Sequence, residues 1–318
     1  MTATLPYIIL FLIGLFTNIR KIKSGYPTTI FFISIFLTFI IITRLRGFQF
    51  DLIVYEKLMQ ETDWGLYYIR EFIFHFILRA IYYITNSATI TFIIIDVMAC
   101  YILFAILRNH QVSTSYAIII FLSVGFMIGF FNIYRQNIAT LLFALAISYA
   151  KIDKYKRSGI VVFLALFVHN AMLFFIPLYI NNWFSGFKAK ILCLITLVVI
   201  LVLIMNDFDR DVVSFDGDNS LKYFVYVSSL VLMISLLSWR LKRDFWNPIF
   251  IQLLSTVAML TLPFNSTERL ILSCVTFLVI EYVILLNEVS QKIAILNLVF
   301  LCIFTVPFVY SGVYENIL

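Results

Sequence analysis

The sequence predicts an all-α polytopic integral membrane protein, and three observations lead to this fold class. Hydrophobic residues make up 63% of the 318-residue chain and charged residues only 13%, a composition too apolar for a soluble domain. Long apolar runs such as Tyr7–Phe16, Thr29–Ile42 and Ile191–Met205 follow one another along the chain, so there is more than a single anchor. These runs do not alternate between apolar and polar residues, which excludes a membrane β-barrel.

About ten segments are candidate spans, because roughly 20 apolar residues cross a bilayer and fewer suffice where it thins. They cover residues 5–19, 28–43, 89–107, 114–131, 136–150, 188–206, 222–239, 245–262, 268–287 and 292–310. Two further stretches, 66–84 and 159–180, are ambiguous. No repeat, linker or low-complexity segment is visible, so we expect one transmembrane domain over residues 1–318.

The basic residues predict the orientation. The net charge of +6 comes largely from short loops at 20–23, 151–157 and 240–243, and such loops stay in the cytoplasm. This pattern argues against nucleic-acid binding, which needs a basic face on a folded domain. We expect the loops at 44–65 and 206–221 on the outer face. We expect the N-terminus there as well, since no basic residue precedes the first apolar run, and about ten spans bring the C-terminus to the same side. The four cysteines lie far apart inside apolar runs and indicate neither a disulfide framework nor a zinc site.

The same orientation constrains the two ambiguous stretches. Residues 159–180 must return to the side from which they entered, and His169–Asn170 lie at their middle, so we expect a re-entrant hairpin of two half-length helices with a polar tip. Residues 66–84 become a non-crossing element on the outer side. Its charges fit an interfacial or partly inserted amphipathic helix; they are Arg70, Glu71, His75 and Arg79.

This topology gathers polar residues from distant parts of the chain at the outer face. Guanidinium groups bind phosphate or pyrophosphate bidentately and keep their charge, so Arg46, Arg135 and Arg269 are candidates for an anion site. The alternatives are that Arg44 and Arg46 are neutralised by Asp51 or reach to water, and that Arg135 anchors a helix end at the membrane boundary.

Three further ionisable residues are candidates for chemistry. His169 could accept a proton or bind a sugar hydroxyl, or it could be a structural histidine bonded to a freed backbone carbonyl. Glu71 could be a general base, or it could pair with Arg70, Arg79 or another nearby arginine. Asp96 is a lone acid within an apolar span, for which we expect a structural partner.

The segment 261–269 joins two spans. Ser266 or Thr267 could cap the second helix, and Glu268 suits its first turn, whereas the cation Arg269 does not unless an anion offsets it. Aromatic residues near the outer cluster could stack on sugar rings; they are Tyr55, Trp64, Tyr67, Tyr68 and Tyr134. The motifs of soluble hydrolases, nucleotide-binding proteins and zinc proteases are absent from the sequence.

Six short motifs follow one another between residues 40 and 290. They are Arg46–Gly47 with Asp51 and Tyr55, Glu71 before an aromatic stretch, Asn132 with Arg135–Gln136, a basic loop, Phe167–Ala171, and Glu268–Leu270. This succession resembles the EpsG/Wzy family of bacterial polysaccharide polymerases. Ala171 stands where the family often has Ser, and the family usually has a residue between its first Arg and Gly, so that arginine corresponds to Arg44 or to Arg46.

The resemblance implies a glycosyl transfer without metal or cofactor on the outer face of the bacterial inner membrane. The growing O-antigen or capsular glycan leaves its undecaprenyl diphosphate and joins a sugar hydroxyl of the next lipid-linked repeat unit. Arg46, Arg135 and Arg269 would bind the diphosphate, and the base would be His169, Glu71 or Asp51. Further substrate contacts would come from Tyr55, Asn132, Gln136 and Glu268. The partners implied are lipid-linked glycans in the membrane and a regulator of chain length.

Three other functions remain as alternatives. An O-antigen ligase would use the same arginines with a different acceptor. A lipid-linked oligosaccharide flippase would show paired repeats and a charged cavity open to the cytoplasm. A membrane acyltransferase would need an acidic residue close to His169, at the spacing of an HxxxD motif, which the sequence lacks.

Overall fold

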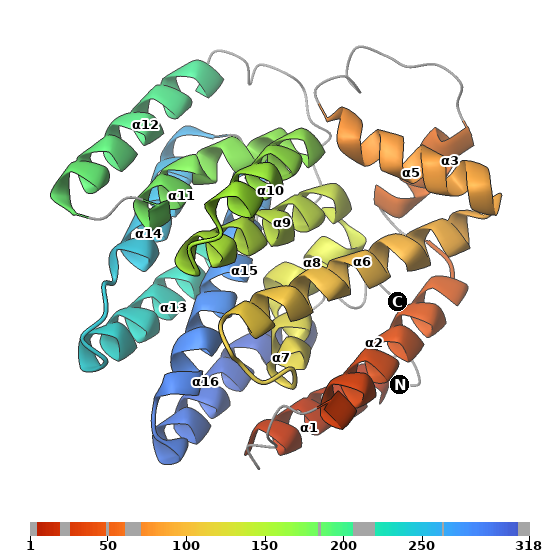
Figure 1. The fold of residues 1–318 in the computed structure, drawn as a ribbon, viewed down its shortest axis with the longest axis horizontal. Helices are drawn as coiled ribbons and strands as arrows, with labels where there is room; N and C mark the ends of the chain where they lie inside the picture. The colour runs from red at the N-terminus through yellow and green to blue at the C-terminus, as the bar shows by residue number, and fades with distance from the viewer. Residues whose placement is uncertain are drawn as a thin grey trace.

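The computed structural model describes residues 5–19, 26–48, 51–60, 71–183, 186–205, 220–262 and 264–310, and every regular element in these ranges is helical (Figure 1). The elements are α1 (Leu5–Ile19), α2 (Tyr26–Leu45), α3 (Asp51–Gln60), α5 (Phe72–Thr85), α6 (Ala88–Asn109), α7 (Tyr116–Leu122), α8 (Val124–Phe131), α9 (Tyr134–Lys151), α10 (Tyr155–Val168), the 3-10 helix η1 (Asn170–Phe175), α11 (Ile176–Trp183), α12 (Phe187–Met205), α13 (Ser220–Arg240), α14 (Trp246–Thr261), α15 (Phe264–Glu288) and α16 (Gln291–Tyr310).

The all-α class is confirmed, and the helices are those of a multi-pass membrane protein. Among the residues that the structure describes, four helical stretches are long and apolar enough to cross a bilayer, and several shorter apolar helices accompany them. The four are Pro27–Leu45, Ala88–Asn109, Leu221–Arg240 and Ser266–Glu288. The total of about ten spans stays a prediction. Much of the expected outer loops, including Trp64, Tyr67 and Tyr68, lies outside the described residues.

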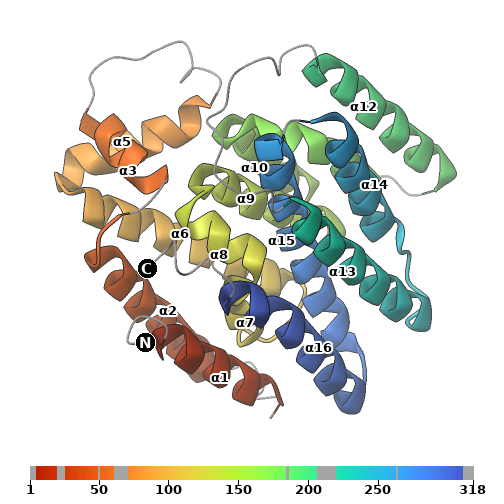
Figure 2. The same cartoon turned by 180° about the vertical axis from the view of Figure 1, so that it is seen from behind.

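Helix α15 forms the centre of the bundle. Its apolar window is 89% buried, whereas that of α2 at the periphery is 28% buried. It packs against α8, α9, α13 and α14 (Figures 1 and 2). A Cβ atom at Gly125 of α8 would lie 2.6 Å from the Leu272 carbonyl oxygen of α15, so glycine is what allows these two helices to approach so closely. The packing fixes the start of α15, which carries Arg269.

The segment expected as one span over residues 114–131 is broken in the structure. Ser123 has φ −65° and ψ 147°, an extended conformation that separates α7 from α8. Its hydroxyl donates to the Ile120 carbonyl at 2.6 Å, a local bond that competes with the helical pattern. Ser123 is buried, so the irregular backbone is covered by protein, as it must be at membrane depth.

Helices α10 and α11 form the expected hairpin with His169–Asn170 at its tip. The hydroxyls of Ser158 and Tyr179 lie 3.0 Å apart, and the rings of Tyr155 and Trp183 stack with centroids 5.3 Å apart. The beginning of α10 and the end of α11 therefore lie at the same end of the molecule. The first arm is longer than the half-length helix expected, because the 14 residues of α10 extend about 21 Å. The second arm consists of η1 and the eight residues of α11.

Two of the three basic loops, at 151–157 and 240–243, lie at the end of the bundle opposite to the hairpin tip, and the third, at 20–23, lies outside the described residues. Burial, followed by the charges of the nearby Lys151 and Arg243, lowers the pKa of His110 to about 4. Arg243 also pairs with Glu288 at 2.8 Å. This clustering is what the positive-inside rule requires of loops that share one side of a membrane.

Helices α3 and α5 pack together where α2 ends and α6 begins (Figures 1 and 2). The inner face of α5 buries Phe74 and His75, while Phe76 and Tyr83 are exposed. Arg79 turns inward as well, and its Nε donates to the Leu58 carbonyl at 3.2 Å. The helix is amphipathic as expected. Its polar residues His75 and Arg79 face the protein together with Phe74, and its outward face is apolar, an arrangement suited to lipid.

Candidate active site

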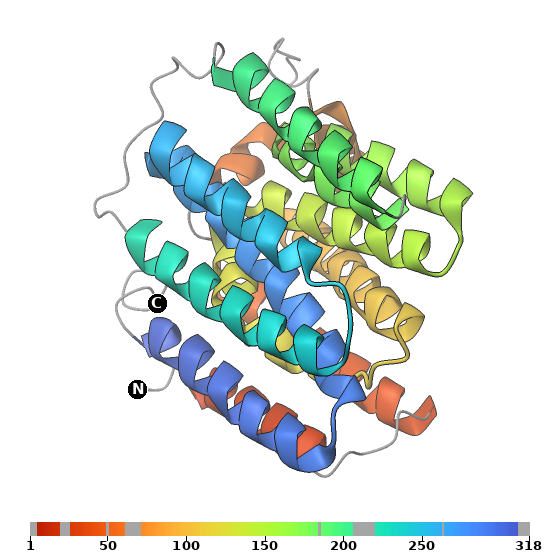
Figure 3. The same ribbon diagram turned by 90° about the vertical axis from the view of Figure 1, so that its left-hand side faces the viewer.

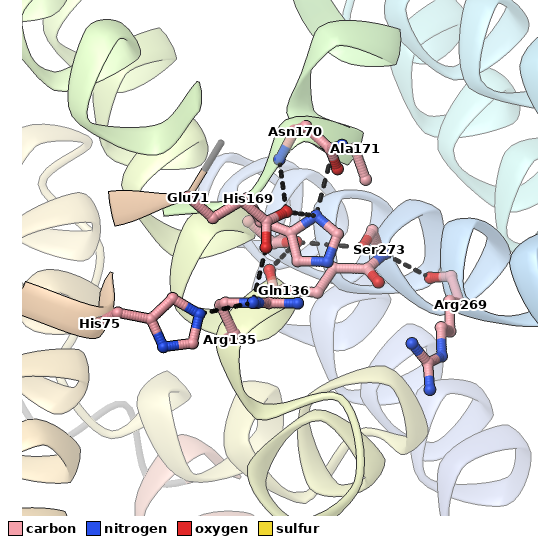
Figure 4. A network of polar contacts seen from close by, with 10 residues as sticks. Glu71, His75, Arg135, Gln136, His169, Asn170, Ala171, Arg269 and Ser273 are labelled. Atoms are coloured by element: carbon pink, nitrogen blue, oxygen red, sulfur yellow. Dashed lines mark hydrogen bonds and ion pairs between the residues drawn. The ribbon is translucent and has the colours of Figure 1, made fainter. Parts of the chain in front are cut away.

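A cavity of about 260 Å³ lies at the end of the bundle where α9 and α15 begin. Its walls come from α3, α5, α9, the hairpin tip and α15. The lining residues are Asp51, Val54, Tyr55, Leu58, His75, Ile133, Arg135, Gln136, His169 and Arg269. Six of the ten site residues expected from the sequence are among them, so distant segments meet here as the topology predicted (Figure 4).

Arg135 lies in the first turn of α9, where a cation is unfavourable because the N-terminus of a helix is itself positive. Glu71 offsets this cost, since its Oε2 lies 2.6 Å from Arg135 Nη1. The same nitrogen lies 3.0 Å from His75 Nε2. A guanidinium can only donate, so His75 accepts at Nε2 and is neutral, with its proton on Nδ1.

Glu71 joins three parts of the structure just outside the cavity. It precedes α5, it pairs with Arg135 of α9, and its Oε1 accepts a hydrogen bond of 3.1 Å from the Asn170 backbone N–H at the hairpin tip. Burial raises the pKa of Glu71, and the Arg135 charge and the Asn170 N–H oppose that rise. Pairing with a nearby arginine, one of the two roles expected for Glu71, is what the structure shows.

His169 points its ring into the cavity from the hairpin tip (Figure 4). The Ala171 backbone N–H donates to His169 Nδ1 at 3.0 Å. Burial, followed by the charges of Arg135 and Arg269, lowers the pKa of His169 well below its ordinary value, so the ring is neutral. With Nδ1 occupied as an acceptor, the single ring proton lies on Nε2, and His169 offers a hydrogen-bond donor there.

Asp51 contributes a carboxyl group to the lining of the cavity. It begins α3, and the Tyr134 backbone N–H at the start of α9 donates to it. Burial raises the pKa of Asp51, while the charges of Arg269 and Arg135 lower it. Asp51 is therefore a carboxylate held between cations in a largely desolvated place, which makes it more basic than an exposed aspartate.

Gln136 links α9 to α15 through side-chain hydrogen bonds. Its Nε2 donates to the Arg269 carbonyl at 2.8 Å and to Ser273 Oγ at 2.9 Å, and Thr140 donates to the same Ser273 at 3.0 Å. The Arg269 side chain extends away from this contact and lines the cavity (Figure 4). Gln136 thereby fixes the backbone that carries Arg269.

A buried ion pair between α2 and α6 stabilises the structure next to the site. Arg44 Nε lies 2.6 Å from Asp96 Oδ2, and Arg44 Nη2 donates to the Phe130 carbonyl at 3.2 Å. The hydroxyl of Tyr134 donates to Asp96 Oδ1 at 2.7 Å. The structural partner expected for Asp96 is thus Arg44, which ties α2 and α6 to the turn that presents Arg135.

Four of the expected site residues do not line the cavity. Arg46 is exposed, Asn132 is half-buried at the end of α8, and Glu268 lies near Tyr223 of α13. Glu71, the fourth, reaches the cavity only through Arg135 and the hairpin tip. Thr267 does not cap α15 but donates to the Ala258 and Leu262 carbonyls at the end of α14, at 3.0 and 3.1 Å.

His75 and Ser273 belong to the site although the sequence analysis gave them no role in it. His75 follows Glu71 by four residues, a spacing that puts both on one face of a helix, and this signal could have found it. Ser273 follows Arg269 by the same interval. Among the described residues, no three His, Cys, Asp or Glu side chains gather in the manner of a metal site.

Residues 29–317 match the model of the EpsG family. The chain belongs to the EpsG family. The family expected from the succession of motifs is therefore confirmed over most of the chain, and the protein is an EpsG-family membrane protein linked to exopolysaccharide biosynthesis. No curated protein and no solved structure matches the chain.

Proposed function

We propose that this EpsG-family protein is a polymerase that joins undecaprenyl-diphosphate-linked repeat units into an O-antigen or capsular polysaccharide on the outer face of the inner membrane. The observation that carries the proposal is the convergence of Arg135, Arg269, Asp51 and His169 on one cavity. Fixed cations, a neutral donor and a carboxylate base are what a glycosyl transfer from a diphosphate leaving group needs.

The two arginines bind the leaving group. Arg269 lines the cavity, and Arg135 reaches it while held by Glu71 at 2.6 Å. Negative charge develops on the diphosphate as the glycosidic bond breaks, and preorganised guanidinium groups stabilise it without reorganisation. His169 Nε2–H adds a neutral donor to a phosphate or sugar oxygen.

Asp51 is the base in this proposal. The acceptor sugar hydroxyl attacks the anomeric carbon of the growing glycan, the bond from that carbon to the diphosphate oxygen breaks, and the hydroxyl proton passes to Asp51. Glu71 is committed to Arg135 and the Asn170 N–H, and His169 has its proton on the nitrogen that is free to face the cavity. Of the three candidates, Asp51 alone lines the cavity with a carboxylate that can take the proton.

The size of the cavity fits the reacting groups and not a whole repeat unit. Its volume of about 260 Å³ is below the roughly 300–1,000 Å³ of typical ligand pockets. The diphosphate and the sugar bonded to it would occupy it, while the rest of the glycan stays outside and the prenyl chains stay in the bilayer.

The test uses purified protein in nanodiscs with a lipid-linked repeat unit, with and without a chelator, and the products are separated on a gel. The wild type is expected to form a ladder in both conditions, and Arg269→Ala is expected to leave the unextended repeat. Arg157→Ala removes an exposed cation from the opposite end of the bundle and serves as the control. A ladder of normal length from Arg269→Ala would refute the proposal.

A cellular readout separates the polymerase from its rivals. In cells with Arg135→Ala or Arg269→Ala, single repeats should still reach the surface while long polymer is lost. Repeats stranded at the cytoplasmic face would indicate a flippase instead. Transfer of a finished glycan to a lipid acceptor, without elongation, would indicate a ligase.

A further inference from the structure

A groove of about 870 Å³ lies between α13 and α16, at the end of the bundle opposite to the candidate active site. Both helices pack on α15, and Figures 2 and 3 show α13 and α16 running side by side across it. The walls of the groove are apolar, with Met233 and Leu236 on α13 and Ile293 and Phe300 on α16.

The rim of this groove carries three cations. Arg240, Lys242 and Arg243 follow one another where α13 ends. Glu288 neutralises Arg243 at 2.8 Å, and within the described ranges no carboxylate lies within ion-pair distance of Arg240 or Lys242. Trp239, whose side chain is 75% exposed, stands beside them, as indole rings do at the boundary between lipid and water.

The positive-inside rule alone accounts for basic residues in this loop, but it does not require an apolar groove beneath them. The loop at 151–157 carries one cation more, and none of its residues lines this groove. Two unneutralised cations above a groove between two apolar helices are complementary to one class of molecule, a diacyl phospholipid with an anionic head group.

We propose that the groove between α13 and α16 binds an anionic phospholipid, with its phosphate at Arg240 and Lys242 and its acyl chains along Leu236, Ile293 and Phe300. The site is distinct from the candidate active site and does not depend on the reaction proposed there. The lipid would fill the groove between these two helices.

The experiment measures how many lipids of each kind the purified full-length protein retains, by native mass spectrometry after exchange into phosphatidylglycerol or phosphatidylcholine. The wild type should retain phosphatidylglycerol preferentially. The double variant Arg240→Gln/Lys242→Gln should lose about 30-fold in this preference, since each cation near an anionic lipid contributes about fivefold. The matched control, Lys154→Gln/Lys156→Gln, removes two cations from the other basic loop and should keep it.

A second variant tests the groove itself. Leu236→Trp places a large ring in the groove without changing any charge, and it should also lower the retention of phosphatidylglycerol. Equal losses in the two double variants would mean that general surface charge attracts the lipid, and equal retention of both lipids by the wild type would mean that it is an ordinary annular lipid. Either result would overturn the proposal, as would unchanged retention in Leu236→Trp.

Discussion

The ion pair of Glu71 and Arg135 allows a quantitative test of how the site is held together. Glu71 is 4% exposed and Arg135 8% exposed, so removing one partner strands the other charge in a poorly solvated place. Such a loss typically costs about 3–5 kcal/mol. Glu71→Gln should approach this value, because both carboxylate oxygens face donors, Arg135 Nη1 at 2.6 Å and the Asn170 N–H at 3.1 Å. The amide nitrogen of glutamine, itself a donor, would have to face one of them.

The double variant Glu71→Gln/Arg135→Gln should be less damaged than the two single costs together. Two neutral amides can bond to each other, so we expect a coupling free energy of about 2–3 kcal/mol in the double-mutant cycle. The assay is reversible unfolding of the protein in bicelles, measured for all four forms. Additive single effects would refute the ion pair as the element that joins α5 to α9.

Protonation gives an independent check on the same pair. In Arg135→Gln the charge that lowers the pKa of Glu71 is gone, so burial raises that pKa further. The folded state then takes up a proton more readily than the unfolded chain, and the stability gained in this way is lost as the pH rises through the raised pKa. The deficit of Arg135→Gln relative to wild type should therefore shrink as the pH falls, whereas the deficit of Glu71→Gln should not.

Three further predictions concern the proposed reaction and its support. Asp51→Asn should lower the polymerisation rate by about 10²–10⁴-fold, and because Arg269 lowers the pKa of Asp51, Arg269→Ala should move the rising limb of the remaining pH–rate profile to higher pH; a shift to lower pH would contradict the role of Asp51 as base. His169→Ala should lower the rate by about 10²–10³-fold and His169→Gln by much less, since glutamine keeps a donor, and equal losses in the two variants would argue against a donor role. Asp96→Asn should destabilise the fold by about 3–5 kcal/mol by stranding Arg44, measured by the same unfolding assay, and a neutral result would mean that the pair is not a structural support.

Some of this arrangement follows from sequence because charge and hydropathy constrain a membrane chain strongly. The hairpin at 159–180 follows from the sidedness of the basic loops, and a partner for Asp96 follows from the cost of an isolated acid among apolar residues. The sequence does not identify that partner, because Arg44 and Arg46 are two residues apart and the rotation of the end of α2 decides which of them faces Asp96. The structure turns Arg44 inward and leaves Arg46 exposed.

Other features depend on contacts that no local pattern records. No proline marks the helix break at Ser123 in the sequence. The break is accompanied by a hydrogen bond from the Ser123 hydroxyl to a carbonyl of the preceding turn. The hydrogen bond from Gln136 to Ser273 depends on the relative positions of α9 and α15 along their axes, which are set by packing across the bundle. In both cases tertiary structure selects among conformations that the sequence alone leaves open.

The charges around the cavity would couple binding of the donor lipid to proton uptake by Asp51. Arg135 is paired with Glu71, and the pKa of Asp51 is raised by burial and lowered by the charges of Arg269 and Arg135. A bound diphosphate would leave an excess of negative charge, and proton uptake by Asp51 would relieve it. Occupancy by the donor lipid and the proton affinity of Asp51 are then thermodynamically linked, each favouring the other. In the proposed reaction, arrival of the donor would therefore raise the affinity of Asp51 for the acceptor's proton.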